Sequence, residues 1–132
     1  MPFLLCTNDS PELELSGTPA ELRAIGHEVE AFFESPERTR VFPMSLAADP
    51  RPYSRSVTSL LLVVADGLVR ISIEAAGHVQ VAGSADNLRL FGKWFTAFDD
   101  SAPDGYHVHY EGWPGDEHVA EDSVGLVIAV RR

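Results

Sequence analysis

Two stretches of the chain decide the fold: LELSGTPAELRAIGHEVEAFFE, from Leu13 to Glu34, and VQVAGSADNLRLFGKWFTAFDD, from Val79 to Asp100. They align at an offset of 66 residues, and six of their 22 positions are identical. The similarity resumes further on, where Leu60 to Val64 aligns with Leu126 to Val130. This self-similarity predicts an internal duplication, with halves 1–66 and 67–132. The alternative is two similarly patterned units with chance identities.

Each repeat reads as a strand followed by a helix. Leu13 and Leu15 alternate with polar residues, as in a half-buried strand. Thr18 and Glu21 flank Pro19 in a capping box that predicts a helix start. The helices then show apolar stripes at helical spacing, ending near Phe33 and Phe98. The other expected strands are 3–6, 39–44, 57–64, 68–73, 107–110 and 124–130, with turns at 8–11 and 76–77.

These elements predict an α+β fold of two tandem ββαββ units in one domain, residues 1–132. We expect one antiparallel sheet or two antiparallel half-sheets, with both helices packed on one face and an approximate twofold axis relating the halves.

Gly26 and Gly92 fall inside the helices, beside the buried stripes. Because glycine is unfavourable in a helix, we expect a close approach of backbone there, either helix to helix or helix to sheet.

Charge and composition restrict the function. The net charge is −10, from 20 acidic and 10 basic residues. Nucleic acids and anionic membranes bind basic surfaces, so neither is an expected partner. No apolar run is long enough for a membrane helix, and Cys6 is the single cysteine, as is usual in a reducing compartment. We expect a cytoplasmic protein that is a monomer or a weak homodimer.

His107 and His109 are candidates for metal binding. Alternate residues of a strand share a face, so both imidazoles would project together. His118 lies nearby in sequence and could complete the site, with Glu111 or Asp116. Two histidines supply only half of a ligand set, and structural histidines on a half-exposed strand are commoner.

The long loop before the last strand is a candidate protein-binding surface. No Lys or Arg occurs between Lys93 and Arg131, while this stretch holds eight acidic residues together with aromatic ones. Aromatic side chains among acids are typical of an interaction surface, although loops also diverge without functional consequence. The expected partner-binding residues are Glu111, Trp113, Asp116, Glu117, Glu121 and Asp122.

The second half of the chain resembles bacterial immunity protein family 32. The resemblance is carried by Gly83-Ser84, Leu88, the HVH motif at 107–109, Ser123 and the run 126–128, within residues 79–130. It implies a non-enzymatic protein that binds and neutralises a cognate toxin of a polymorphic toxin system. The first half departs from it, because Arg40-Val41-Phe42 stands where the second half has the histidine pair.

The leading interpretation is therefore an immunity-type inhibitor of a basic protein toxin, with no catalytic residues and no cofactor. The alternative is a metal-binding protein or metal-dependent enzyme that uses the His107/His109 pair. A third possibility is a small-ligand binder with a cleft between the halves. No nucleophile elbow or phosphate-binding glycine loop occurs in the sequence.

Overall fold

The structure is a computed structural model that describes residues 1–7, 12–74 and 78–132. The turns expected at 8–11 and 76–77 lie outside the described residues. Elsewhere the chain forms two helices and nine strands, and the fold is α+β. In chain order the elements are β1 (Phe3–Cys6), β2 (Glu12–Gly17), α1 (Pro19–Phe32), β3 (Thr39–Pro43), β4 (Arg55–Val57), β5 (Ser59–Val64), β6 (Arg70–Ile73), β7 (Val79–Gly83), α2 (Ala85–Thr96), β8 (His107–Tyr110) and β9 (Gly125–Val130).

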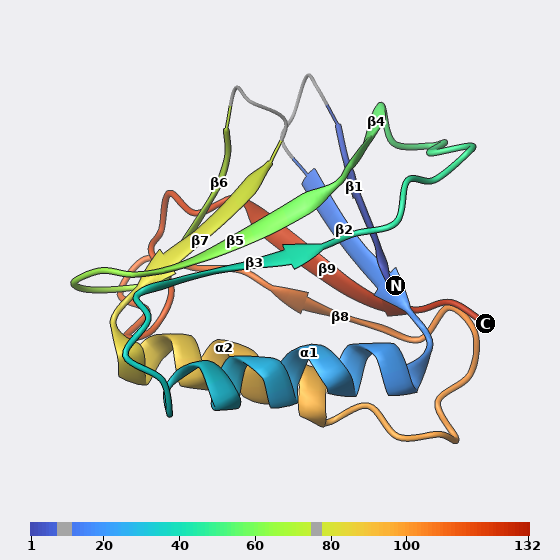
Figure 1. Cartoon of the computed structure of the whole chain (residues 1–132). Helices are drawn as coiled ribbons and strands as arrows, with labels where there is room; N and C mark the ends of the chain where they lie inside the picture. The colour runs from blue at the N-terminus through green and yellow to red at the C-terminus, as the bar shows by residue number, and fades with distance from the viewer. Residues whose placement is uncertain (8–11, 75–77) are drawn as a thin grey trace.

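The strands form two sheets. The five-stranded sheet has the order β4-β1-β2-β9-β8, and the four-stranded sheet has the order β3-β5-β7-β6. Both helices lie side by side on the same side of the two sheets (Figure 1). One hydrophobic cluster runs through both helices and both sheets, so that the helices cover the core that the sheets share.

The expectation of antiparallel sheets is wrong, because each sheet contains one parallel pair. β2 runs parallel to β9 with Gly17 opposite Val130, and β5 runs parallel to β7 with Val64 opposite Gly83. Each parallel pair joins a strand of the first half to a strand of the second. Alternation within one strand shows which face is buried but does not identify a distant partner, so the sequence pattern could not reveal this pairing.

The strand expected at 57–64 is two strands in different sheets. β4 pairs with β1, while β5 pairs with β3, and the chain changes sheet at Thr58. The carbonyl of Thr58 accepts a hydrogen bond from Met44 N at 2.9 Å. An isolated bridge also pairs Phe3 of β1 with Ser45, two residues after the end of β3.

The helix starts expected from the sequence are confirmed. The Thr18 hydroxyl accepts a hydrogen bond from Glu21 N at 3.1 Å, and the Glu21 carboxylate accepts one from Thr18 N at 2.9 Å. This reciprocal capping box satisfies two backbone donors at the start of α1. Ser84 caps α2 in a similar position, because its hydroxyl accepts from Asn87 N.

The close approach expected at the two helix glycines is between helix and helix. A Cβ atom added to Gly26 would lie 2.9 Å from the carbonyl oxygen of Gly92 and 3.1 Å from Thr96 N. A Cβ atom added to Gly92 would lie 2.7 Å from Val29 Cγ1. The distances to Gly92 O and Val29 Cγ1 are too short for real contacts, and the distance to Thr96 N is unusually tight, so glycine at these positions sets the spacing of α1 and α2.

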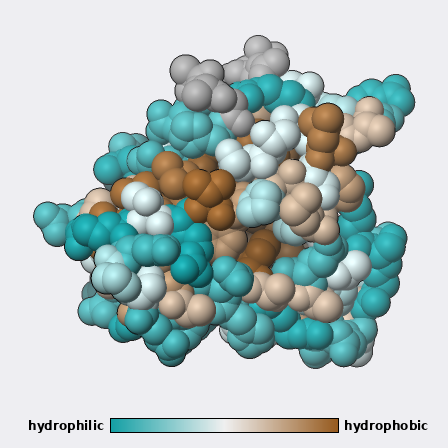
Figure 2. All heavy atoms as spheres, viewed as in Figure 1, coloured by the Kyte–Doolittle hydropathy of each residue, from teal (hydrophilic) through white to brown (hydrophobic). Residues whose placement is uncertain are grey.

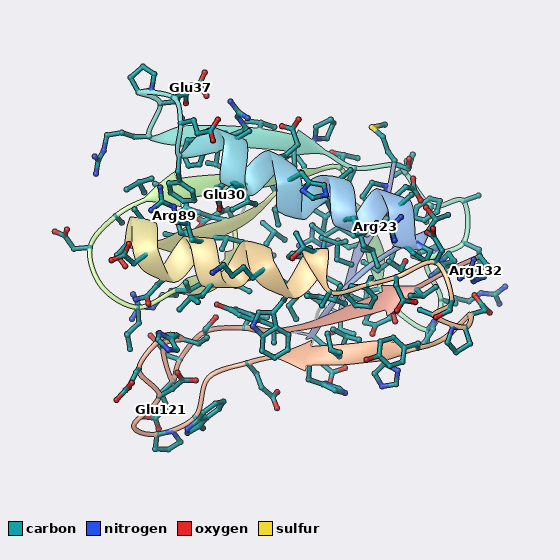
Figure 3. The ribbon with its side chains drawn as sticks, turned by 90° about the horizontal axis from the view of Figure 1, so that it is seen from below. Arg23, Glu30, Glu37, Arg89, Glu121 and Arg132 are labelled. Carbon is teal, nitrogen blue, oxygen red and sulfur yellow. The ribbon has the colours of Figure 1, made fainter. Side chains whose placement is uncertain are left out.

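Charged side chains also hold the two helices together. Figure 3 shows Glu30 of α1 and Arg89 of α2 facing each other, with a closest nitrogen–oxygen distance of 4.0 Å. The Arg89 guanidinium also lies 5.0 Å from the centre of the Phe33 ring. Arg23 donates to the carbonyl of Phe98 at 2.9 Å and so ties α1 to the segment that follows α2.

The outer face of the four-stranded sheet carries apolar side chains. Val41 is 60% exposed and lies opposite Leu61 in the register of β3 and β5. Figure 2 shows this apolar surface over β3 and β5. Neither of the two described helices has the length and hydropathy needed to span a membrane.

Candidate protein-binding site

β8 divides its side chains between two faces. Val108 and Tyr110 point toward the core, where Tyr110 is only 3% exposed. His107 and His109 are both exposed, and their ring centroids lie 5.3 Å apart. The expectation that the two imidazoles share one face is therefore confirmed, as the alternation of a strand requires.

His118 does not join this pair through any interaction in the described residues. Its Nδ1 lies 3.1 Å from Asn87 Oδ1 of α2, whereas His107 Nδ1 lies 3.0 Å from the carbonyl of Gly105. Among residues 1–7, 12–74 and 78–132, no group of three or more His, Cys, Asp or Glu side chains is arranged to hold a metal ion.

The loop that follows β8, residues 111–122, has an internal framework of turns. Gly115 has a positive φ of 85°, and Asp116 N donates to the carbonyl of Trp113 at 3.0 Å. The Asp116 carboxylate accepts hydrogen bonds from His118 N at 2.8 Å and Val119 N at 3.2 Å. These contacts fix the direction of the turn that carries Trp113.

The same loop is held against the four-stranded sheet. Val69 N donates to the carbonyl of His118, and Ala120 N donates to the carbonyl of Val69, both at 2.8 Å. At Gly112, an added Cβ atom would overlap the carbonyl group of Ala120, so glycine lets the two arms of the loop approach each other. A loop anchored in this way presents its exposed side chains in a defined arrangement, which lowers the entropy lost on binding.

A groove of about 590 Å³ lies between α2, β8 and this loop. Figure 3 shows α2 beside β8, with the loop that carries Glu121 extending past them. We call this depression the aromatic groove. Its principal lining side chains are Trp94, Tyr106, Val108, Tyr110, Glu111 and Trp113.

Three of the aromatic residues that line the groove are unusually exposed. Trp113 is 61% exposed, Tyr106 49% and Trp94 41%. They come from three different segments: the loop, the residue before β8, and α2. Large aromatic side chains that gather around one depression are typical of recognition surfaces.

Tyr110 forms part of the groove lining and is electrostatically unusual. Its ring packs edge-to-face against Phe91 and Trp94, with centroid distances of 5.0 and 5.4 Å. Its hydroxyl is buried and has no hydrogen-bond partner among the described residues. Burial, reinforced by the nearby negative charge of Asp116, raises the pKa of Tyr110, so the phenol stays protonated.

Some acidic residues of the loop are bound by other groups of the described chain, and others are not. Asp122 pairs with Arg70 at 3.0 Å, and Asp116 is occupied by the turn. Glu111, Glu117 and Glu121 are exposed and form no ion pair with the described residues. Three of the six expected partner-binding residues, Glu111, Trp113 and Asp116, line the aromatic groove, while Glu117 and Glu121 lie on the same loop outside its lining.

A second depression, of about 340 Å³, lies on the histidine side of β8. Its polar lining includes Glu12, Glu14, Tyr53, His107 and His109. Glu111 and His109 line both depressions. The unpaired carboxylate of Glu111 therefore stands at the boundary between an apolar surface and a polar one.

Trp94 is not among the site residues predicted from the sequence. The apolar stripe of α2 consists of Leu88, Phe91 and Phe95, which are buried. Trp94 falls beside this stripe and is exposed, although it is the largest residue of the helix. A tryptophan on the polar side of an amphipathic helix was the signal that could have identified this wall of the groove.

Comparisons with known proteins agree with the resemblance noted in the sequence. The family model for immunity protein 32 matches residues 12–39 and 78–130, more than half of the chain. The second matched segment contains α2, β8, the loop and β9, and thus nearly all of the groove. Neither curated proteins nor solved structures give a match. The chain belongs to the immunity protein 32 family.

Proposed function

We propose that this protein neutralises a cognate bacterial toxin by binding it as a protein inhibitor, without catalysing a reaction. Membership of an immunity protein family carries this proposal. The surface that supports it is the loop 111–122, where Trp113 and three glutamates without an ion pair among the described residues are exposed on one anchored segment. Because the chain has a net charge of −10, we infer that the toxin is basic.

The experiment that tests this function is coexpression with a candidate toxin domain, sought first among the genes that neighbour this one. Wild-type protein should restore growth and should form a complex with a purified, catalytically inactive form of that domain. Glu117→Lys and Glu121→Lys should each weaken the complex, because both carboxylates are exposed and neither forms an ion pair in the part of the chain that the structure describes. Glu34→Lys changes the total charge equally, and Glu34 is an exposed residue outside the loop, so it is the matched control.

Two results of this experiment would contradict the proposal, each in a different way. Failure of the wild-type protein to bind or protect would contradict the immunity function for that toxin. Equal weakening by all three variants would show that only net charge matters, and would contradict the assignment of the loop 111–122 as the binding surface.

Metal binding by His107 and His109 is the second candidate function. The observation in its favour is the contact between the two imidazole rings. A third ligand is needed, and the described residues supply no arranged group of three. A partner or a bound molecule would have to contribute that ligand.

We also infer that the halves 1–66 and 67–132 are copies of one unit. The strand registers support this, because the pair Gly17/Val130 and the pair Gly83/Val64 correspond at the repeat offset of 66. The bridges Phe3/Ser45 and Val69/Val119 begin at residues with the same offset. A half-length member of the family that dimerises with this strand order would support the inference, and a half-length member with a different strand order would contradict it.

A further inference from the structure

We propose that the aromatic groove receives a large apolar side chain of the toxin, and that a Lys or Arg next to this side chain pairs with Glu111. This inference rests on the proposed immunity function and names the chemistry of the partner segment. It commits the groove to a protein segment that is both apolar and basic.

The size and lining of the groove support an apolar occupant. A volume of about 590 Å³ exceeds what one side chain needs, so a side chain and the backbone around it fit together. Trp94 of α2 and Trp113 of the loop both line the groove and are exposed without the partner. Covering two tryptophans removes a large apolar area from water, and such residues supply most of the energy in protein interfaces.

The charges around the groove favour a cation beside the apolar group. Glu111 and Asp116 line it, and among the described lining residues Lys93 is the one Lys or Arg, beside the imidazoles of His109 and His118. Glu111 is exposed and has no ion pair within the described chain, so its carboxylate is available. Asp116 is already engaged by two backbone amides and contributes only to the local negative field.

The Tyr110 hydroxyl is a second, independent indication that a partner binds in the groove. Its buried hydroxyl has no hydrogen-bond partner in the described residues, whereas nearly all buried polar groups in proteins have one. A polar atom of the incoming segment that displaces the side chains covering this hydroxyl would supply the missing partner. This is the feature that distinguishes the groove from the apolar outer surface of β3 and β5, where no such group occurs among the described residues.

A protein segment fits the surroundings better than a small molecule. Glu117 and Glu121 extend the exposed negative charge along the loop beyond the groove lining. A small ligand within the groove would not reach these residues, whereas a basic protein seated on the groove would cover the whole loop. The same contacts that anchor the loop hold this surface ready for a large partner.

The test measures binding of the full chain to the catalytically inactive form of the toxin domain that the coexpression experiment identifies. Trp113→Ala should raise Kd by at least about 30-fold, as expected for a central aromatic residue. Glu111→Gln should raise Kd by about 10-fold and should reduce the salt dependence of binding. Leu46→Ala is the control, because Leu46 is 72% exposed and does not line the groove, and it should change Kd by less than about twofold.

A second measurement shows whether the variants fold. Trp113 and Glu111 are exposed, so both variants should keep the thermal unfolding midpoint of the wild type. Tyr110→Phe adds a readout that a purely structural role would not give: weaker binding together with unchanged stability.

The results distinguish failure of this inference from failure of the function. If wild type does not bind the toxin domain, the proposed function and the groove assignment both fall for that partner. If wild type binds and the Trp113 and Glu111 variants bind equally well, the function stands and the groove assignment is overturned. A wild-type dimer that Trp113→Ala dissociates would assign the groove to a second copy of this chain and would also overturn it.

Discussion

Replacing Gly26 with alanine should destabilise the protein, although alanine is the better helix former. In an open helix position this change would raise the free energy of unfolding by about 1 kcal/mol. Here the added methyl group would lie 2.9 Å from Gly92 O and 3.1 Å from Thr96 N, both backbone atoms of α2. A backbone atom cannot move aside as a flexible side chain can, so the two helices would have to separate.

The size of the effect follows from two opposing terms. Overpacking a tight contact costs about 1–3 kcal/mol, and we take the upper value because the obstacles are backbone atoms. After the gain in helix propensity, the net loss is about 2 kcal/mol. In a chain of this size, that loss corresponds to a fall of about 6–8 °C in Tm.

Thermal and urea unfolding followed by circular dichroism would measure this loss. Gly125→Ala is a suitable control, because the nearest atom to its added Cβ, Glu111 Oε2, lies 3.5 Å away at an ordinary contact distance. We expect that control to change Tm by less than about 2 °C. A Gly26→Ala variant that unfolds at the wild-type temperature or above it would refute the close helix contact, because only an open position would be stabilised.

Three further predictions concern single groups. Tyr110→Phe should leave the free energy of unfolding unchanged or raise it by about 1 kcal/mol in urea titrations, because the hydroxyl is buried without a hydrogen-bond partner among the described residues. A clear fall in the free energy of unfolding would show that the hydroxyl does have a hydrogen-bond partner. The N-terminal ammonium and the backbone N–H of Thr18 lower the pKa of Glu21 below its ordinary value of 4.5, so its stabilisation is present above that pH and is lost as the pH falls through the lowered pKa. The stability difference between wild type and Glu21→Gln should therefore shrink on acidification, and a constant difference would contradict the contact. Elemental analysis should find no stoichiometric zinc, nickel or iron, because His118 does not join the histidine pair; metal that disappears in His107→Ala/His109→Ala would favour the metal-binding alternative.

Local features of the fold could be predicted from sequence because their causes are local. Thr18 and Glu21 are three residues apart, and their reciprocal hydrogen bonds depend on little else. The alternation of His107 and His109 likewise needs only an extended backbone. The division into two sheets depends on contacts between segments far apart, and no single segment encodes them. The near-continuous apolar runs of β5 and β9 are typical of parallel strands, but they do not identify the strand with which each one pairs.

Only the part of the candidate site that lies on one continuous segment could be predicted from the sequence. The composition of the loop 111–122 pointed to an exposed acidic and aromatic surface, and the structure places Glu111 and Trp113 beside one groove. Trp94 enters that groove from α2, a contact that requires knowledge of the tertiary packing. Asp122 was expected to be available but pairs with Arg70, which is 52 residues away in sequence.

The parallel pairing of β2 with β9 has a consequence for synthesis of the protein. β9 lies between β2 and β8, so the β2 edge has no neighbouring strand until the ribosome has released residues 125–130, although β4 can already pair with β1. Folding of the five-stranded sheet must therefore wait until residues 125–130 have been translated. A ribosome that stalls before that point yields a nascent chain with an open β2 edge, which is exposed to chaperones and proteases and has no formed inhibitor surface.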